Sequence, residues 1–109
     1  MKNLRRYERI EYPLKVACLT NFQIFETKTR NSSLQGACLF SPVEFEPGED
    51  LSLIFKLPVK KMFAVPAQVV WSKRIKSSQP YGYQIGVEYI CLPSPYRREL
   101  ETLIKKLGS

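Results

Sequence analysis

Apolar and polar residues alternate along most of the chain, and this period of two is typical of a β-strand that is buried on one face. Six such runs follow one another, bounded by proline, glycine or polar turn residues. The polar stretch from Asn31 to Gly36, between the second and third runs, is typical of a turn. We expect strands over Leu14–Thr20, Gln23–Arg30, Ala37–Phe40, Leu51–Leu57, Val65–Trp71 and Tyr81–Tyr89.

A proline, a tryptophan and two glycines within these runs lead to further structural predictions. Pro66 has no backbone donor for a sheet ladder, so we expect an edge strand or a bulge at this position. Trp71 continues the alternation of Val69, which favours a place in the core. Gly82 and Gly86 share the opposite face of the last strand, which indicates that another group approaches its backbone closely.

The period changes to that of a helix near the end of the chain. Ser94 followed by Pro95 is the residue order of an N-cap and a first helical position. Apolar residues then recur at helical spacing, namely Tyr96, Leu100, Leu103, Ile104 and Leu107. An amphipathic helix here would cover an open end or face of the sheet. The prediction is therefore a mainly β protein, a small six-stranded antiparallel β-barrel with a C-terminal α-helix.

Composition narrows the possible classes of protein. With 109 residues, of which 44% are hydrophobic and 25% charged, the chain has room for one globular domain. Cys18, Cys38 and Cys91 are an odd number and lie in apolar runs, so we expect buried free thiols in a reducing compartment. The chain has no histidine and no CxxC pair, so we expect no metal. No apolar run approaches the ~18 residues of a membrane span, so we expect a cytoplasmic protein without membrane insertion.

Charge points to an anionic partner. The chain carries 17 Lys and Arg against 10 Asp and Glu, a net charge of +7. Acidic residues are absent between Leu51 and Val87, so one side of the molecule should be positive. Arg5, Arg6 and Arg9 precede the first strand, and a guanidinium grips a phosphate or a guanine edge with two bonds. On their own these arginines are typical of a solvated terminus.

Motifs for catalysis are missing from the sequence. Histidine, the commonest general base, is absent, as are a Gly-rich phosphate loop and a GxSxG nucleophile turn. The carboxylates gather in turns and on the final helix, where charge is solvated. We expect a binding protein and not an enzyme.

Two short motifs acquire meaning together. Arg5-x-x-x-Arg9 precedes the first strand, and Asn31-x-Ser33-x-x-Gly36 follows the second. With this order of strands and a final helix, the chain resembles the PilZ family of small β-barrel receptors of cyclic di-GMP. The resemblance implies that the two arginines clamp phosphates and guanine edges, that Asn31 and Ser33 bind the other guanine, and that Gly36 allows a close approach.

The same resemblance implies a division of the chain. Residues 1–12 would form a flexible basic arm carrying the arginines, and residues 13–109 would form the PilZ barrel with its helix. Arg6 would support the arginine pair, and Trp71 is a weaker candidate for stacking on a base. Asn31 stands where many members have aspartate; its amide is a donor as well as an acceptor, which lowers the expected affinity.

The implied function is that of a bacterial cyclic di-GMP receptor and adaptor. A ligand that bridges the arm and the barrel would order the arm and create a surface for an effector protein. Two alternatives remain open. A small basic barrel with exposed aromatic residues also fits single-stranded nucleic acid, and a PilZ-like adaptor without ligand would act through protein contacts alone. For the receptor we expect no DNA partner.

Overall fold

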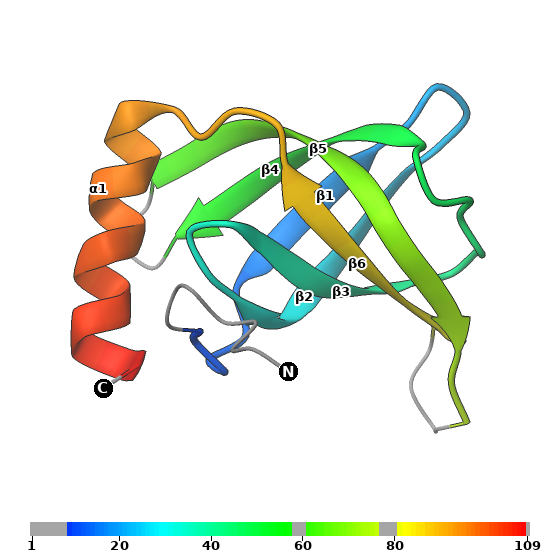
Figure 1. Cartoon of the computed structure of the whole chain (residues 1–109), viewed down its shortest axis with the longest axis horizontal. Coiled ribbons are helices and arrows are strands. Elements are labelled where there is room, and N and C mark those ends of the chain that lie inside the picture. Colours follow the sequence, from blue (N-terminus) through cyan, green and yellow to red (C-terminus); the bar gives the residue numbers. More distant parts are fainter. Residues whose placement is uncertain (1–8, 58–60, 77–80, 109) are drawn as a thin grey trace, which may run out of the picture.

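The computed structural model describes residues 9–57, 61–76 and 81–108. Its strands are antiparallel neighbours in the order β1-β2-β3-β6-β5-β4 and close into a barrel (Figure 1). The predicted six-stranded antiparallel barrel is confirmed. The strands are β1 (Lys15–Leu19), β2 (Ile24–Ser32), β3 (Gly36–Ser41), β4 (Asp50–Leu57), β5 (Lys61–Arg74) and β6 (Tyr83–Tyr89).

The interior of the barrel is filled by alternate residues of each strand. Leu53 and Phe55 of β4 are fully buried, as are Val65 of β5 and Ile85 of β6. Each such side chain contributes roughly 1.5–3 kcal/mol by leaving water, so the core supplies the main stabilising term. The same alternation leaves every second residue of each strand on the outer surface.

A helix covers one end of the barrel (Figure 1). Helix α1 (Ser94–Leu103) continues as the π-helical turn η1 (Ile104–Gly108). Tyr96 and Leu100 are fully buried, and the ring of Tyr96 stacks on Phe55 with the ring centroids 5.1 Å apart. The expected amphipathic helix is present and closes the core at this end.

The expected cap of this helix is wrong. The N-cap position is Pro93, no side chain caps the helix by a hydrogen bond, and Ser94 is the first helical residue. Pro95 therefore stands one position later than predicted, still in the first turn, where its missing N–H is tolerated.

Pro66 lies inside β5, opposite Ser52 of β4. The described strands close into a barrel, so β5 is not an edge strand, and its bulge comes after Val69 and not at Pro66. The prediction of an edge strand or a bulge at Pro66 is therefore wrong. The carbonyl of Pro66 accepts a hydrogen bond from the N–H of Ile90 at 2.9 Å, beyond the end of β6. The backbone N and O of one strand residue point to the same side of the strand. The N–H that Pro66 lacks would therefore have pointed beyond the last residue of β6, where the ladder does not need it.

The cysteines are free, and they differ in exposure. Cys18 and Cys38 are buried as predicted, whereas Cys91 is exposed, so the prediction is wrong for Cys91. Burial raises the pKa of the Cys18 thiol to about 12. Cys91 follows β6 in the connection to α1, where its place in an apolar run does not bury it.

Candidate functional site

A backbone bridge fastens the chain ahead of β1 to the end of β2. The N–H of Ile10 donates to the carbonyl of Ser32 at 2.7 Å, and the N–H of Ser32 donates to the carbonyl of Ile10 at 3.0 Å. The side chain of Ile10 is fully buried in the core. Arg9, directly before this bridge, is therefore held close to the strand that carries the second motif.

Arg9 of the first motif and Asn31 of the second motif are in contact beside this bridge. Nη1 of Arg9 donates a hydrogen bond to Oδ1 of Asn31 at 2.8 Å. Asn31 lies within β2, so the turn predicted to begin there starts later, after Ser32. The register between β2 and β3 shifts between Thr29 and Asn31, and such a bulge redirects a side chain.

Arg5 and Arg6, the other two arginines of the first motif, lie outside the described residues. The expected arm of residues 1–12 is described only from Arg9 onward. Its flexibility stays a prediction, and Ile10 marks the point where the chain joins the barrel core.

The turn between β2 and β3 is fixed by its own polar groups. Oγ of Ser33 accepts hydrogen bonds from the N–H groups of Gln35 at 3.1 Å and Gly36 at 3.4 Å. The carbonyl of Gln35 accepts the N–H of Tyr89 at 2.9 Å, which ties the turn to β6. A Cβ at Gly36 would collide with the carbonyl of Val87, so the glycine permits the close approach of β3 and β6. The turn therefore holds the Ser33 hydroxyl in a fixed position, with the residue only 7% exposed.

Trp71 is exposed, and the prediction of a core position is wrong. Its side chain is 40% exposed, because a bulge between Val69 and Trp71 inserts one extra residue into β5 and reverses the faces beyond it. The indole lies over Gly86 of β6, at the place that a Cβ would occupy. The expected close approach is therefore confirmed at Gly86. It is wrong at Gly82, where an added Cβ would meet nothing within 4 Å.

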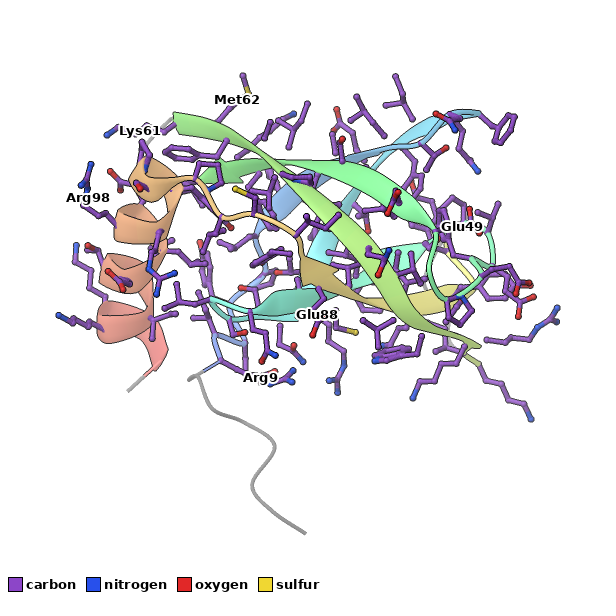
Figure 2. All side chains as sticks on the ribbon, turned by 45° about the horizontal axis from the view of Figure 1, so that its top comes forward. Arg9, Glu49, Lys61, Met62, Glu88 and Arg98 are labelled. Carbon is purple, nitrogen blue, oxygen red and sulfur yellow. The ribbon has the colours of Figure 1, made fainter. Side chains whose placement is uncertain are left out.

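Two surface hollows meet at Trp71. The smaller, of about 180 Å³, is lined by the Ser33 turn and by Trp71, Gly86 and Glu88. Figure 2 shows Arg9 and Glu88 on the same side of the barrel. The larger hollow, of about 530 Å³, has no acidic residue among those that line it. Its basic side chains are Arg9, Arg30, Lys73 and Lys76.

The positive charges converge on one region of this surface. Nζ of Lys73 lies 5.8 Å from the centroid of the Trp71 ring, within the range of a cation–π contact. Cys38 lines both hollows. Burial raises the pKa of its thiol, and the charges of Arg30, Lys73 and Arg9 act in the opposite direction. An anion placed here would therefore be attracted by several cations at once.

Several residues of this surface were not singled out from the sequence. Arg30 was expected only as a strand end, and Lys73 and Lys76 only as part of a stretch without acids. These residues can be recognised as one site only from the pairing of β2 with β3, of β3 with β6 and of β6 with β5, which brings distant segments together.

The described residues contain no group of three or more histidine, cysteine, aspartate or glutamate side chains placed to hold a metal ion. In the same ranges, neither α1 nor η1 has the length and apolar character that crossing a bilayer requires. The site is thus built from guanidinium, amine, amide, hydroxyl and indole groups. These groups suit a ligand with negative charge and flat, hydrogen-bonding rings.

A closed six-stranded barrel with a terminal helix and a basic, aromatic surface defines a small β-barrel domain. The sequence profile of the PilZ domain matches residues 3–106, so the chain belongs to the PilZ domain family. No curated protein sequence matches the chain significantly.

Solved structures have the same fold. The inhibitor of motility MotI/DgrA of Bacillus subtilis superposes with a TM-score of 0.80 at 21% identity, over 96% of this chain and 51% of that one. The PilZ domain of YcgR from Escherichia coli, solved with c-di-GMP, gives 0.71 at 17% identity, over 96% and 92%. The MrkH–c-di-GMP complex of K. pneumonia gives 0.77 at 14%, over 97% and 53%. This chain spans about half the length of the MotI and MrkH chains.

Proposed function

We propose that the chain is a cyclic di-GMP receptor that acts as an adaptor in the bacterial cytoplasm and signals to a partner protein. The observation that carries the proposal is the 2.8 Å hydrogen bond between Arg9 and Asn31, which joins the two PilZ motifs on one basic surface. Membership of the PilZ family supports the same ligand, as do the YcgR and MrkH structures solved with c-di-GMP.

The chemistry of the ligand matches the groups on this surface. Cyclic di-GMP carries two phosphates and two guanines. Arg9, Arg30 and Lys73 would bind the phosphates by charge-assisted hydrogen bonds. The indole of Trp71 would stack on a guanine, while Asn31 and Ser33 would bond to a guanine edge. Arg5 and Arg6, which precede Arg9 in the sequence, would supply further guanidinium groups.

Ligand binding would exchange hydrogen bonds at Asn31 in this proposal. Oδ1 of Asn31 already accepts from Arg9. A guanine that donates to the same oxygen would compete with Arg9, whose guanidinium would then turn to a phosphate. The segment ahead of Ile10 would follow that movement, because Arg9 joins it directly. This rearranged segment is the surface that a partner protein would recognise.

Calorimetric titration with cyclic di-GMP tests the receptor function. We expect Arg9→Ala and Arg5→Ala each to weaken binding roughly ten- to hundredfold, since each removes a charge-assisted bond. Arg98→Ala is the matched control, because Arg98 is an exposed arginine on α1, away from Arg9 (Figure 2). Equal affinity of the wild type and both arginine variants would contradict the proposal.

Single-stranded nucleic acid is the second candidate ligand. The half-exposed Trp71 beside Lys73 favours it, because an indole flanked by a cation is a stacking platform for any base. Salt separates the two candidates. Binding of an oligonucleotide should weaken steeply with salt through counterion release, whereas a ligand with two phosphates should show a shallow dependence. Absence of binding to either would favour an adaptor that acts by protein contacts alone.

A further inference from the structure

The outer surface of β1 and β4, with the adjoining parts of β2 and β5, faces away from the Trp71 site on β3 and β6. These strands pair in continuous register, so their outward residues form rows that cross the strands. Met62 ends one of these rows, and Figure 2 shows it on the opposite side of the barrel from Arg9. Two features of this surface stand out, a row of lysines and a band of apolar residues.

The lysine row consists of Lys28, Lys15 and Lys56. Lys15 is the direct cross-strand partner of both Lys28 and Lys56. Neighbouring strands are about 4.8 Å apart, and like charges in direct opposition destabilise a sheet. Glu26 pairs with Lys56 at 3.6 Å. Within the described ranges, no carboxylate lies within ion-pair distance of Lys15 or Lys28. Folding alone does not account for this arrangement, because it costs stability.

The lysine row borders a hollow of about 440 Å³. Lys15, Lys28 and Lys56 all line it, together with the aromatic residues Phe40 and Tyr81 and one acidic residue, Glu26, which pairs with Lys56. Tyr81 is fixed there, because its hydroxyl donates to the carbonyl of Glu26 at 2.8 Å. The hollow therefore offers positive charge at its rim and apolar surface within reach.

The apolar band follows along the same strands. Ile24 pairs with Leu19 across β2 and β1, and Ala17 pairs with Ile54 across β1 and β4. Ile24 is 69% exposed. Single exposed apolar residues are ordinary, but register brings these residues together, with Ser52 between Leu19 and Pro66 and Glu26 beside Ala17. The band is completed on β5 and just beyond β6 by Ala64, Pro66 and Ile90.

We propose that this surface docks an acidic segment of a partner protein, with carboxylates on the lysine row and apolar side chains on the apolar band. Charge complementarity favours an acidic partner, because a second copy of this chain would bring the same lysines and a net charge of +7. The described strands are all paired in the barrel, so the contact is made by side chains and not by addition of a strand. The surface borders the proposed cyclic di-GMP site at Phe40, which lines both hollows, but its lysines and apolar band lie outside that site and do not depend on it.

Fluorescence anisotropy with a fluorescein-labelled peptide of alternating glutamate and leucine tests this docking surface. We expect binding to the wild type, weakened roughly two- to fivefold by Lys15→Ala and by Lys28→Ala, since each removes an exposed ion pair. Ile24→Ser should weaken the same peptide by a comparable factor, because it removes part of the apolar contact. Lys73→Ala is the control, since Lys73 is an exposed lysine of the Trp71 surface, and it should leave the affinity unchanged.

Three results would overturn this proposal. The first is a wild type that does not bind the peptide, or that binds it as well after Lys15→Ala and Lys28→Ala. The second is binding to phosphatidylserine vesicles that requires Lys15 and Lys28 while the peptide does not bind, which would make the surface a membrane contact. The third is a dimer in sedimentation velocity that Ile24→Ser dissociates, which would assign the band to a second copy.

Discussion

The indole of Trp71 occupies the space that a side chain at Gly86 would fill. The two residues are partners across β5 and β6, directly after the bulge that turns Trp71 outward. The absence of a side chain at Gly86 thus leaves the space that the exposed indole of Trp71 occupies, and this space holds the aromatic platform in place. A ligand that stacks on the indole finds the ring already positioned, which reduces the ordering cost of binding.

Replacing Gly86 by alanine should displace this platform. The added methyl group meets the indole, and the indole, being a partly exposed side chain, can swing toward solvent. Trp71 is the only tryptophan of the chain, so its fluorescence reports on this change. We expect a red-shifted emission and at least roughly fivefold weaker binding of cyclic di-GMP, from the loss of base stacking.

Gly82→Ala is the matched control for Gly86→Ala. A Cβ at Gly82 meets nothing within 4 Å, so both emission and affinity should stay at the wild-type values. An unchanged emission in Gly86→Ala itself would show that the indole does not depend on this space.

Asn31→Asp should strengthen cyclic di-GMP binding. A carboxylate only accepts hydrogen bonds, so it complements the donors of a guanine edge better than an amide. We expect a gain of roughly three- to tenfold in calorimetric titration. Asn21→Asp makes the same change of charge at an exposed position between β1 and β2, and should have no effect. Equal or weaker binding of Asn31→Asp would mean that the amide donor is used or that the carboxylate retains Arg9 by an ion pair.

Ile10→Ala should destabilise the whole domain, although Ile10 lies ahead of the first strand. The side chain is fully buried, so its truncation leaves a cavity and should cost about 2–4 kcal/mol of unfolding free energy in urea denaturation. Ile24→Ala, at a side chain that is 69% exposed, should change this free energy by about 0.5 kcal/mol or less. Similar losses in the two variants would contradict the burial of Ile10.

Stability should fall in alkaline solution. Burial raises the pKa of Cys18 from 9.0 to about 12, so between these values the unfolded chain loses a proton that the folded chain keeps. The folded state therefore binds more protons, and the unfolding free energy should decrease by about 1.4 kcal/mol per pH unit for this group. Below pH 9 the Cys18 thiol is protonated in both states, and its contribution to the unfolding free energy is fully present.

Denaturation curves recorded from pH 8 to pH 11 test the alkaline decline. Burial also raises the pKa of Tyr96, which adds to the decline at the upper end of this range. Cys18→Ala should make the curve shallower by one proton than that of the wild type. Equal slopes in Cys18→Ala and the wild type would be the contrary result.

Regular alternation was enough to predict that the six strands exist, although β5 runs from Lys61 to Arg74, well beyond the predicted Val65–Trp71. The stretch Leu51–Leu57 was expected as a strand, and β4 runs from Asp50 to Leu57. Alternation of this kind is strong evidence, because a slip of one residue would expose every core side chain of the strand. The helix was predictable for a similar reason, since Tyr96 and Leu100 recur at helical spacing and are both buried.

Positions that depend on an irregularity or on distant pairing were not predictable. Trp71 seemed internal because Val70, the extra residue of the bulge, is apolar like its neighbours and gives no local signal. Arg30 and Lys73 lie on strands far apart in the sequence and share a hollow only because β3 and β6 lie between them. Arg9 and Asn31 were proposed together from motif resemblance, while their contact follows from the Ile10 bridge.

That bridge also sets the length of a tether. Ile10 is fixed in the core, and four residues of chain from Arg9 to Arg5 can extend at most about 14 Å. A side chain on a tether of this length has an effective concentration of millimolar order or higher near its anchor. A ligand held by the barrel would meet this second arginine as an intramolecular neighbour, so a weak individual contact would suffice to capture it.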